Sequence, residues 1–502
     1  MLILTNPPAS EALYTACSVT VNGIPAKTTA ARVSAMPYNT SWPGMQRPID
    51  QTELAPVLSF SSDETVTVTV TYETAPAEVL VRPLSKGITA EVKGSTATLT
   101  ISTPGAYTVE ADGFHNALHI FFDPVKDFEP CASGMETVLR YGAGIHEVGD
   151  VEIFSNTAII LDRDAVVYGS FTAVNAENVT VCGYGVIDGS RELRDDHTPL
   201  LPYDYDGPIP ADREAFWQFM ADTRCLNGIL RFYRCRNIRV EGVTLRDAST
   251  FALIPANCED MVIDNLKTIG MWRYNSDGID LFNCRRVVIR NCFLRDFDDC
   301  IVLKGIKGWD EWSMEHILVE NCVTWCDWGR NLEIGAETNA PTYRDIVFRD
   351  CDCIHGSTAF CDIQHHNRAD IFDVTFEDIR CEYTKYQLPD TYQHDMNAPF
   401  TPATPTRHPI LLAAPILKMG LFAKDGLNGR THDVTFRNIQ ILTDAEGLPR
   451  PAVWIVGVDE EHNVTDVTVD GVYRDGKRLA KDEMDWQINE FVRDIRFLTE
   501  GE

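Results

Sequence analysis

Three stretches of one pattern decide the fold of this chain: Val287-Val-Ile289-Arg-Asn-Cys292, Ile317-Leu-Val319-Glu-Asn-Cys322 and Ile346-Val-Phe348-Arg-Asp-Cys351. Each begins by alternating apolar and other side chains, which is the period of a β-strand with one buried face. Each then places Asn or Asp, which favour turns, before another apolar residue. The pattern therefore predicts a strand that ends in a sharp bend.

The same pattern recurs over most of the chain. Further copies begin at Val179, Ile238, Met261, Val374, Val434 and Val467. Neighbouring copies start 23 to 33 residues apart, except for two intervals of 59 and 60 residues that predict an inserted loop or a degenerate unit. Such units are too short for a propeller blade of ~40–45 residues and lack a helical period. They predict a right-handed parallel β-helix, in which each coil buries its inner side against its neighbours.

The first part of the chain has a different pattern. Short alternating stretches are predicted as strands at 65–70, 78–81, 96–101 and 107–110. Short strands joined by turn residues are typical of an antiparallel β-sandwich. We therefore expect an all-β protein, with a sandwich over residues 1–124 and the β-helix over 125–502.

Two segments of the β-helix region are predicted to be insertions, near residues 190–216 and 384–430. The first is rich in Asp, Pro and Tyr, and the second contains several prolines before an apolar stretch at 410–421. Long loops in a regular coil are usually functional. We expect them to wall off one end of a cleft, and the apolar stretch to offer a surface for self-association.

Composition restricts the partners and the location. The chain of 502 residues has 44 Lys and Arg against 74 Asp and Glu, a net charge of −30, which argues against nucleic acids and anionic membranes as partners. No apolar run reaches the ~18 residues of a membrane helix. The N-terminus lacks the features of a signal peptide. The 15 cysteines do not form a small disulfide scaffold, so we expect reduced thiols and a buried ladder at Cys292, Cys322 and Cys351 rather than metal ligands or disulfides. Reduced thiols favour a cytoplasmic protein, and a signal peptide removed from the sequence would instead imply secretion.

Two acidic motifs each precede a predicted strand: Asn275-Ser-Asp277-Gly278 and Asp298-Asp299-Cys300. Asp277 and Asp299 are 22 residues apart, about one repeat, so a β-helix stacks them about 5 Å apart. Crowded carboxylates raise the pKa of at least one member and leave an acid beside a base. Glycoside hydrolysis requires that pair. Either motif alone would be a turn or a calcium site; their spacing favours catalysis.

These motifs, with Gly183-Tyr-Gly-Val-Ile-Asp188-Gly189 and Lys304, resemble glycoside hydrolase family 28, the polygalacturonases and their relatives, over residues 140–380. The resemblance implies a β-helix enzyme that inverts the anomeric centre. It implies Asp298 as general acid, with Asp277 and Asp299 holding and deprotonating the attacking water. Asn275 and Lys304 are then predicted to bind substrate, and neither a metal nor a cofactor is required.

The chain departs from the family at two places. The family's Gly-His-Gly motif falls on Gly329-Arg330-Asn331, and its Arg-Ile-Lys motif falls on Asp362-Ile363-Gln364, without either cation. We expect Arg330 to bind substrate, with His365 and His366 either binding sugar or simply lying at the surface. The chain is also similar to the family 49 dextranases, which join a sandwich to a β-helix. Both points favour a neutral or only partly acidic glycan.

Aromatic and charged residues near these motifs are further candidates for sugar binding. Five tryptophans lie in this region, at positions 272, 309, 312, 325 and 328. Indole faces stack on sugars but also pack loops, and Trp328 is the best candidate. Glu333 is predicted to bind hydroxyl groups, and Arg273 to bind substrate or pair with an acid.

The sequence thus predicts an inverting, exo-acting glycoside hydrolase with a carbohydrate substrate. Two alternatives stay open at this point. One is a β-helix polysaccharide lyase that uses Arg330 or Lys304 as its base. The other is a glycan-binding β-helix without catalytic activity, which would not need three aspartates at one corner.

Overall fold

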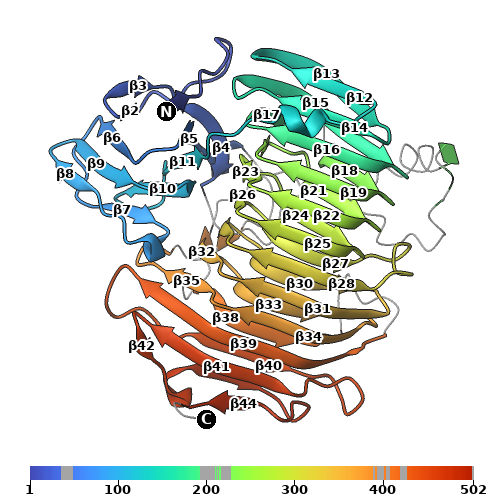
Figure 1. Ribbon diagram of the computed structural model, residues 1–502. Helices are drawn as coiled ribbons and strands as arrows, with labels where there is room; N and C mark the ends of the chain where they lie inside the picture. The colour runs from blue at the N-terminus through green and yellow to red at the C-terminus, as the bar shows by residue number, and fades with distance from the viewer. Residues whose placement is uncertain are drawn as a thin grey trace.

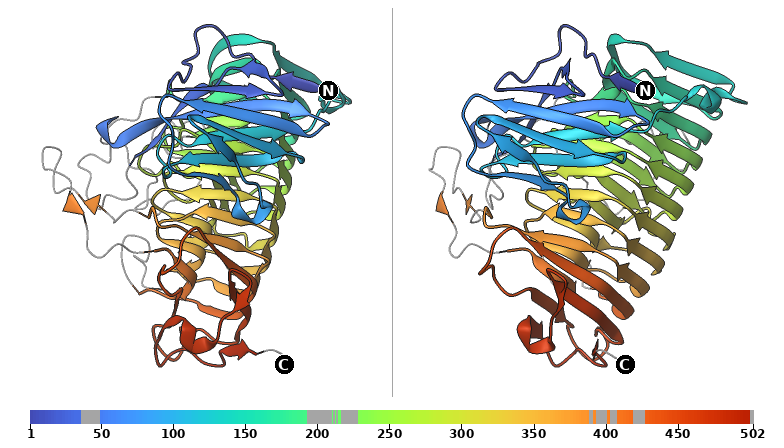
Figure 2. Two further views of the ribbon diagram at one scale, coloured as in Figure 1. Left: turned by 90° about the vertical axis from the view of Figure 1, so that its left-hand side faces the viewer. Right: turned by 60° about the vertical axis from the view of Figure 1, so that its left-hand side comes forward.

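The computed structural model describes residues 1–35, 49–192, 210, 212, 214–215, 228–387, 391–392, 401–402, 408–418 and 427–499. Most of the predicted insertions near 190–216 and 384–430 lie outside the described residues. The chain forms an N-terminal β-sandwich that lies beside a long parallel β-helix (Figures 1 and 2). The predicted fold class is confirmed.

The sandwich consists of two sheets. The first contains β1 (Leu2–Leu4), β4 (Thr29–Ser34), β5 (Thr52–Ser62), β7 (Val79–Arg82), β10 (Gly105–Ala111) and β11 (Leu118–Asp123). The second contains β2 (Cys17–Val21), β3 (Ile24–Ala26), β6 (Val66–Tyr72), β8 (Glu91–Lys93) and β9 (Thr96–Ile101). The pairs are antiparallel, except that β5 and β11 run parallel. Alternating Val and Thr in β6 bury Val66, Val68 and Val70 between the two sheets.

The β-helix has three faces, each a ladder of parallel strands. The first face, which carries the sequence repeat, contains β12 (Thr137–Tyr141), β14 (Thr157–Leu161), β16 (Glu177–Gly183), β19 (Arg236–Glu241), β22 (Glu259–Asp264), β25 (Arg285–Arg290), β28 (Met314–Glu320), β31 (Thr342–Arg349), β34 (Asp370–Glu377), β39 (Arg430–Thr443), β41 (Val467–Arg474) and β44 (Arg496–Leu498).

The second face contains β13 (Gly144–Ile153), β15 (Ala165–Val174), β17 (Val186–Asp188), β20 (Thr244–Arg246), β23 (Lys267–Ile269), β26 (Phe293–Asp296), β29 (Val323–Cys326), β32 (Asp352–His355) and β35 (Arg380–Tyr383). The third face contains β18 (Gly228–Tyr233), β21 (Phe251–Ala256), β24 (Ile279–Phe282), β27 (Ile301–Gly305), β30 (Arg330–Thr338), β33 (Ala359–His365), β38 (Ile410–Pro415), β40 (Ala452–Val456) and β43 (Asp485–Ile488).

Smaller elements complete the description. These are the short strands β36 (Thr391–Tyr392), β37 (Thr401–Pro402) and β42 (Lys477–Arg478), and the 3₁₀ helices η2 (Ile49–Gln51), η3 (Leu84–Lys86), η4 (Glu129–Ala132) and η5 (Lys481–Glu483). Within the described ranges, no helix has both the length and the hydrophobicity to cross a membrane.

The bend that ends each repeat is a left-handed backbone conformation. The Asn or Asp of the pattern has φ between 49° and 57° at Asn265, Asn291, Asn321, Asp350, Asp378 and Asn438, and Gly takes the position at 242 and 471. Asn, Asp and Gly tolerate this conformation better than other residues. The predicted bend is therefore confirmed, and it turns the chain from the first face to the second.

Both long intervals between repeats contain insertions rather than degenerate coils. Val179 pairs directly with Ile238, and Val374 pairs directly with Val434, in register across β16–β19 and β34–β39. The described part of the apolar stretch at 410–421 is buried in the coil and does not form the expected surface for self-association. It includes β38, which lies in the third face with Leu411 and Leu412 fully buried.

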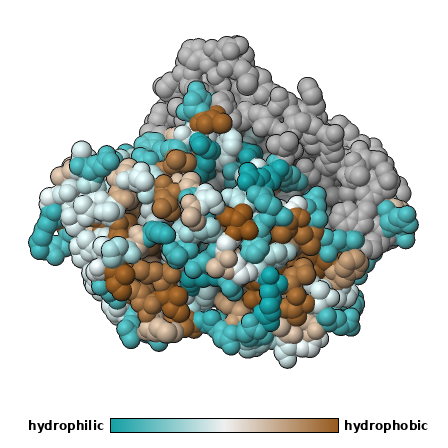
Figure 3. Space-filling model, turned by 90° about the horizontal axis from the view of Figure 1, so that it is seen from above, coloured by the Kyte–Doolittle hydropathy of each residue, from teal (hydrophilic) through white to brown (hydrophobic). Residues whose placement is uncertain are grey.

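Thiols and aliphatic side chains fill the axis of the coil. Cys292, Cys322 and Cys351 are buried, and the fourteen cysteines of the described residues are all unpaired, as the ladder prediction requires. The axis is less well covered at the N-terminal end of the coil, where Leu139 of β12 and Val148 of β13 are only partly buried. Apolar patches on the face of the molecule shown in Figure 3 are separated by polar residues. A terminal coil lacks a neighbour on one side, so partial exposure is expected.

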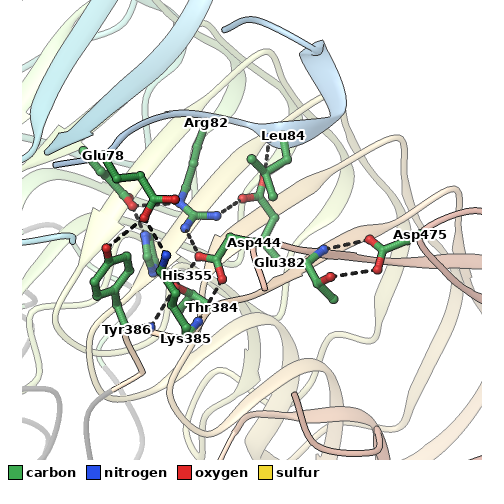
Figure 4. Close-up of polar contacts among 12 residues, drawn as sticks. Glu78, Arg82, Leu84, His355, Glu382, Thr384, Lys385, Tyr386, Asp444 and Asp475 are labelled. Atoms are coloured by element: carbon green, nitrogen blue, oxygen red, sulfur yellow. Dashed lines mark hydrogen bonds and ion pairs between the residues drawn. The ribbon is translucent and has the colours of Figure 1, made fainter. Parts of the chain in front are cut away.

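The sandwich packs on the second face of the β-helix. Val57 and Phe121 of the sandwich contact Phe293 and Trp325 of the coil. Beside this apolar contact, Arg82 is fully buried and binds acids of both domains (Figure 4): its Nε is 2.9 Å from Glu110, its Nη1 contacts Glu382, and its Nη2 is 2.9 Å from Asp444. These contacts hold the sandwich against the coil.

Candidate functional site

The candidate site lies on the outer side of the third face. Ile279, Leu281, Ile301 and Leu303 point into the axis of the coil, so the residues between them point outward. Strand register places Asp280, Val302, Glu333 and Asp362 in one outward column across β24, β27, β30 and β33. Three of these four outward side chains are acidic, and Val302 separates Asp280 from Glu333 and Asp362.

Asp277 and Asp299 are stacked at the entrance of this face, as predicted. Ile279 pairs with Ile301, and the Gly278 N–H donates to the carbonyl of Asp299 at 2.9 Å. On the next coil, the Cys300 N–H donates to the carbonyl of Arg330 at 2.9 Å. Backbone hydrogen bonds of the ladder alone thus set the relative position of the two motifs.

Three carboxylates lie around the ammonium group of Lys304. Its Nζ lies 2.7 Å from Asp277 Oδ2, 2.9 Å from Asp280 Oδ1 and 3.9 Å from Asp299 Oδ2. The lysine side chain is 6% exposed. A buried lysine with three acidic neighbours compensates part of their charge and holds them in place.

Asp298 lies on the other side of Asp299 and has a different environment. Its Oδ2 accepts a hydrogen bond of 3.3 Å from the Asn275 side-chain amide. A Cβ placed on Gly329 would lie 2.3 Å from Asp299 Oδ1 and 2.6 Å from Asp298 Oδ1, so these two oxygens are less than about 5 Å apart. Only glycine fits at position 329 without displacing the carboxylates.

The three aspartates of the two motifs differ in their surroundings. Burial, reinforced by Asp277 and Asp299, raises the pKa of Asp298 well above its ordinary value. Burial also raises the pKa of Asp277, to about 7, with Lys304 opposing the increase. Asp299, in contrast, accepts a 3.0 Å hydrogen bond from the Arg330 backbone N–H and lies near both Lys304 and Arg330. This combination suits a general acid beside a base.

Arg330 forms a second centre, one coil further along. Its Nη1 lies 3.8 Å from Asp299 Oδ1, and its Nε lies 3.8 Å from Glu333 Oε1 and 3.4 Å from Asp362 Oδ2. Burial would lower the pKa of Arg330, but Glu333 and Asp299 outweigh it and raise the pKa. Arg330 therefore stays protonated among three carboxyl groups.

The tryptophans fall into two groups. Trp309 and Trp325 are 2% exposed and belong to the packing of the molecule. Trp328 is only partly buried, and its ring stacks on Phe297 at 5.4 Å and lies 4.9 Å from Tyr274. Because Trp328 directly precedes Gly329, this aromatic cluster lies beside Asp298. Trp328 is thus a partly buried aromatic residue next to the second acidic motif, and its binding of sugar stays a prediction.

The expectation that His365 and His366 lie at the surface is wrong, because both are buried, and a third predicted residue, Arg273, is engaged by the protein. Arg273 contacts Asp247 through its Nη1 and donates to the carbonyl of Ala248 at 3.1 Å. His365 is fully buried, with its Nδ1 2.9 Å from Thr431 Oγ1, and burial lowers its pKa to about 3. His366 is 7% exposed, and its carbonyl accepts from the Asn428 amide.

Asp280 and Asp362 were not predicted as site residues. Both occupy outward positions of strands that follow the acidic motifs or the Arg330 segment, and polar residues at such positions were the available signal. Among the described residues, no group of three or more potential ligands is arranged to hold a metal ion.

Comparison with known proteins bears on the resemblance seen in the sequence. Residues 143–389 match the model of glycosyl hydrolases family 28. A probable polygalacturonase of Arabidopsis thaliana is 27% identical over 118 residues, which are 23% of this chain and 24% of the relative. A second one is 28% identical over 101 residues, 20% of this chain and 22% of the relative. The matched part thus spans about a quarter of each relative.

Two solved structures share the architecture. Dex49A from Penicillium minioluteum has a TM-score of 0.60 at 12% identity, with 97% of this chain and 96% of the other covered. The family 28 exopolygalacturonase of Yersinia enterocolitica has a TM-score of 0.50 at 13% identity, with 86% and 96% covered. These similarities show the fold. Together with the family match, they confirm the predicted resemblance.

Proposed function

We propose that this glycosidase hydrolyses O-glycosidic bonds with inversion, using Asp298 as general acid and Asp277 and Asp299 to hold and deprotonate water. The observation that carries the proposal is the cluster itself. Three carboxylates lie within 4 Å of Lys304, and Asp298 lies beside them without an ion pair to that lysine among the contacts of the described residues. One site thus brings a buried carboxyl group without an ion pair to Lys304 beside carboxyl groups that face this cation.

Asp298, Asp277 and Asp299 differ in their ability to donate a proton, accept a hydrogen bond from water and carry negative charge. Asp298 keeps a proton for the leaving-group oxygen because its pKa is raised well above the ordinary value, first by burial. Asp277 Oδ1 is buried and meets no hydrogen-bond donor within the described residues, which leaves it free to accept from water. Lys304 and Arg330 stabilise negative charge on Asp299. The proposed division of roles follows from these differences.

We propose a neutral or only partly acidic substrate. Asp362 and Gln364 occupy the positions of the family's two cations, and Asp362 already faces Arg330 at 3.4 Å. A uronate would therefore meet a carboxyl group where the family presents a cation. Exo-action and a cytoplasmic location are also part of the proposal. The two insertions support the first, and the unpaired thiols support the second.

The lyase alternative is disfavoured by the state of its candidate bases. Neighbouring acids outweigh burial and raise the pKa of Lys304, and the same holds for Arg330. Neither group is therefore a ready proton acceptor. A lyase would release an unsaturated product that absorbs in the near ultraviolet.

A glycoside screen with proton NMR tests the proposal. Aryl glycosides and oligosaccharides are incubated with the wild type and with Asp298→Asn, and the anomer formed first is recorded. We expect inverted product from the wild type and a loss of activity in the variant. Retained configuration would contradict the mechanism; the short Asp298–Asp299 separation makes this a real alternative, because two carboxyls ~5–5.5 Å apart are typical of retaining enzymes. Internal cleavage of a long polymer would contradict exo-action.

A further inference from the structure

Two carboxyl groups beside Arg330 have hydrogen-bonding capacity that the protein does not use. Glu333 is 0% exposed and Asp362 is 1% exposed. Within the part of the chain that the structure describes, no N–H or O–H donor reaches either oxygen of Glu333 or Oδ1 of Asp362. Burying such groups without donors is unfavourable. A ligand that donates hydrogen bonds to Glu333 and Asp362 would explain why these acids occupy outward positions of the strands.

The contacts of Arg330 with the two acids are longer than ordinary hydrogen bonds. Its Nε lies 3.8 Å from Glu333 and 3.4 Å from Asp362, beyond the usual 2.7–2.9 Å of a charge-assisted hydrogen bond. The Nε atom is itself buried and has no hydrogen-bond acceptor among the described residues. The group of three therefore offers acceptors and a donor together, which is what a pair of sugar hydroxyls requires.

We propose that Glu333, Asp362 and Arg330 form a sugar-binding subsite that accepts hydrogen bonds from hydroxyl groups, and that Asp362 excludes uronates. This inference rests on the proposed function and assigns the substrate class to particular residues. Register places Glu333 and Asp362 on consecutive strands, β30 and β33, directly beyond β27 and its Lys304. The sugar bound there is adjacent to the one that reacts.

Charge explains the exclusion. Arg330 already faces Asp299, Glu333 and Asp362 within 4 Å, so a ligand carboxylate would be a fourth acid around one guanidinium. A like charge at this distance disfavours the ionised form by roughly one pKa unit or more, which corresponds to about tenfold or more in affinity. A neutral sugar avoids that cost and supplies the missing donors.

Two variants with almost unchanged shape test the subsite: Asp362→Asn and Glu333→Gln. The probes are isomaltotetraose, xylotetraose and tetragalacturonate, with kcat/KM measured for each. We expect each variant to lose about ten- to hundredfold in kcat/KM on the preferred neutral probe, mainly through KM, because a buried hydrogen-bonding group of the sugar or the protein loses its partner. We expect Asp362→Asn to improve the ratio of tetragalacturonate to neutral probe at least tenfold.

The matched control is Asp352→Asn. Asp352 is also buried and pairs with an arginine, Arg380, but on β32 of the second face. Its kinetics on the neutral probe should equal those of the wild type, and thermal melting verifies that every variant is folded. Unchanged neutral kcat/KM in Asp362→Asn, or a wild type that prefers tetragalacturonate, would overturn the inference.

Calorimetry separates this inference from the proposed function. If the wild type cleaves none of the probes, binding of the same probes is measured directly. Neutral binding that weakens tenfold or more in Asp362→Asn supports the subsite although hydrolysis has failed. Binding that is absent, or unaffected by both substitutions, overturns the subsite as well.

Discussion

Lys304→Met should move the pH dependence of the reaction in a predictable direction. The lysine Nζ is 2.7 Å from Asp277, whose pKa is about 7 with that positive charge in place. An opposite charge this close lowers the pKa of a carboxyl by about 1–3 units. Without it the pKa of Asp277 should rise to about 8–10. The ionised fraction at pH 7 would fall from about a half to between roughly 10% and 0.1%.

Since a base acts only when ionised, kcat/KM at pH 7 should fall about five- to 500-fold and recover as the pH rises toward 10. The assay is a profile of kcat/KM from pH 5 to 10, on the best glycoside of the screen. A structural role for the lysine would lower activity equally at every pH. Lys267→Met is the control, because Lys267 is also buried and paired, but with Asp123. An acid limb that stays near pH 7 in Lys304→Met would refute the reasoning.

Three further substitutions test other parts of the structure. Asp298→Asn should cost about 10²–10⁴-fold in kcat without lowering the melting temperature, and full activity would exclude a general acid here. Gly329→Ala should reduce activity at least tenfold, because its Cβ meets two carboxylates; Gly142→Ala, with a nearest contact of 3.7 Å, should not, and equal activities would contradict the geometry. Arg82→Met should destabilise the protein by about 3–5 kcal/mol in urea titration, since three acids lose their partner. The exposed Arg140→Met should cost less than about 1 kcal/mol, and similar losses would contradict the role of the buried network.

The repeat and the stacked aspartates could be predicted because both depend on local periodicity. Alternation sets which side chains face the axis, and the Asn or Asp at each bend, such as Asn291 and Asn321, sets where a strand ends. Once the coil length is known, a separation of 22 residues places Asp277 beside Asp299. These steps need no knowledge of distant contacts.

The remaining site residues depend on packing that local periodicity does not encode. Trp325 is buried because the sandwich covers the second face, and no repeat signals which face a separate domain will cover. His365 is buried against Thr431, which is 66 residues away in sequence. Asp362 acquires its significance only from the position of the Arg330 side chain.

The direct pairing of strands across the two long intervals separates the scaffold from its loops. Val179 pairs with Ile238, and Val374 pairs with Val434, although a long segment of chain separates the members of each pair. Doubling a flexible connection costs only about 0.6 kcal/mol of closure entropy. Segments at these two bends can therefore be lengthened, shortened or exchanged during evolution while the register of every coil is preserved. The substrate range of such a coil can diversify independently of its stability, and the same two junctions are the natural points for grafting loops from related enzymes.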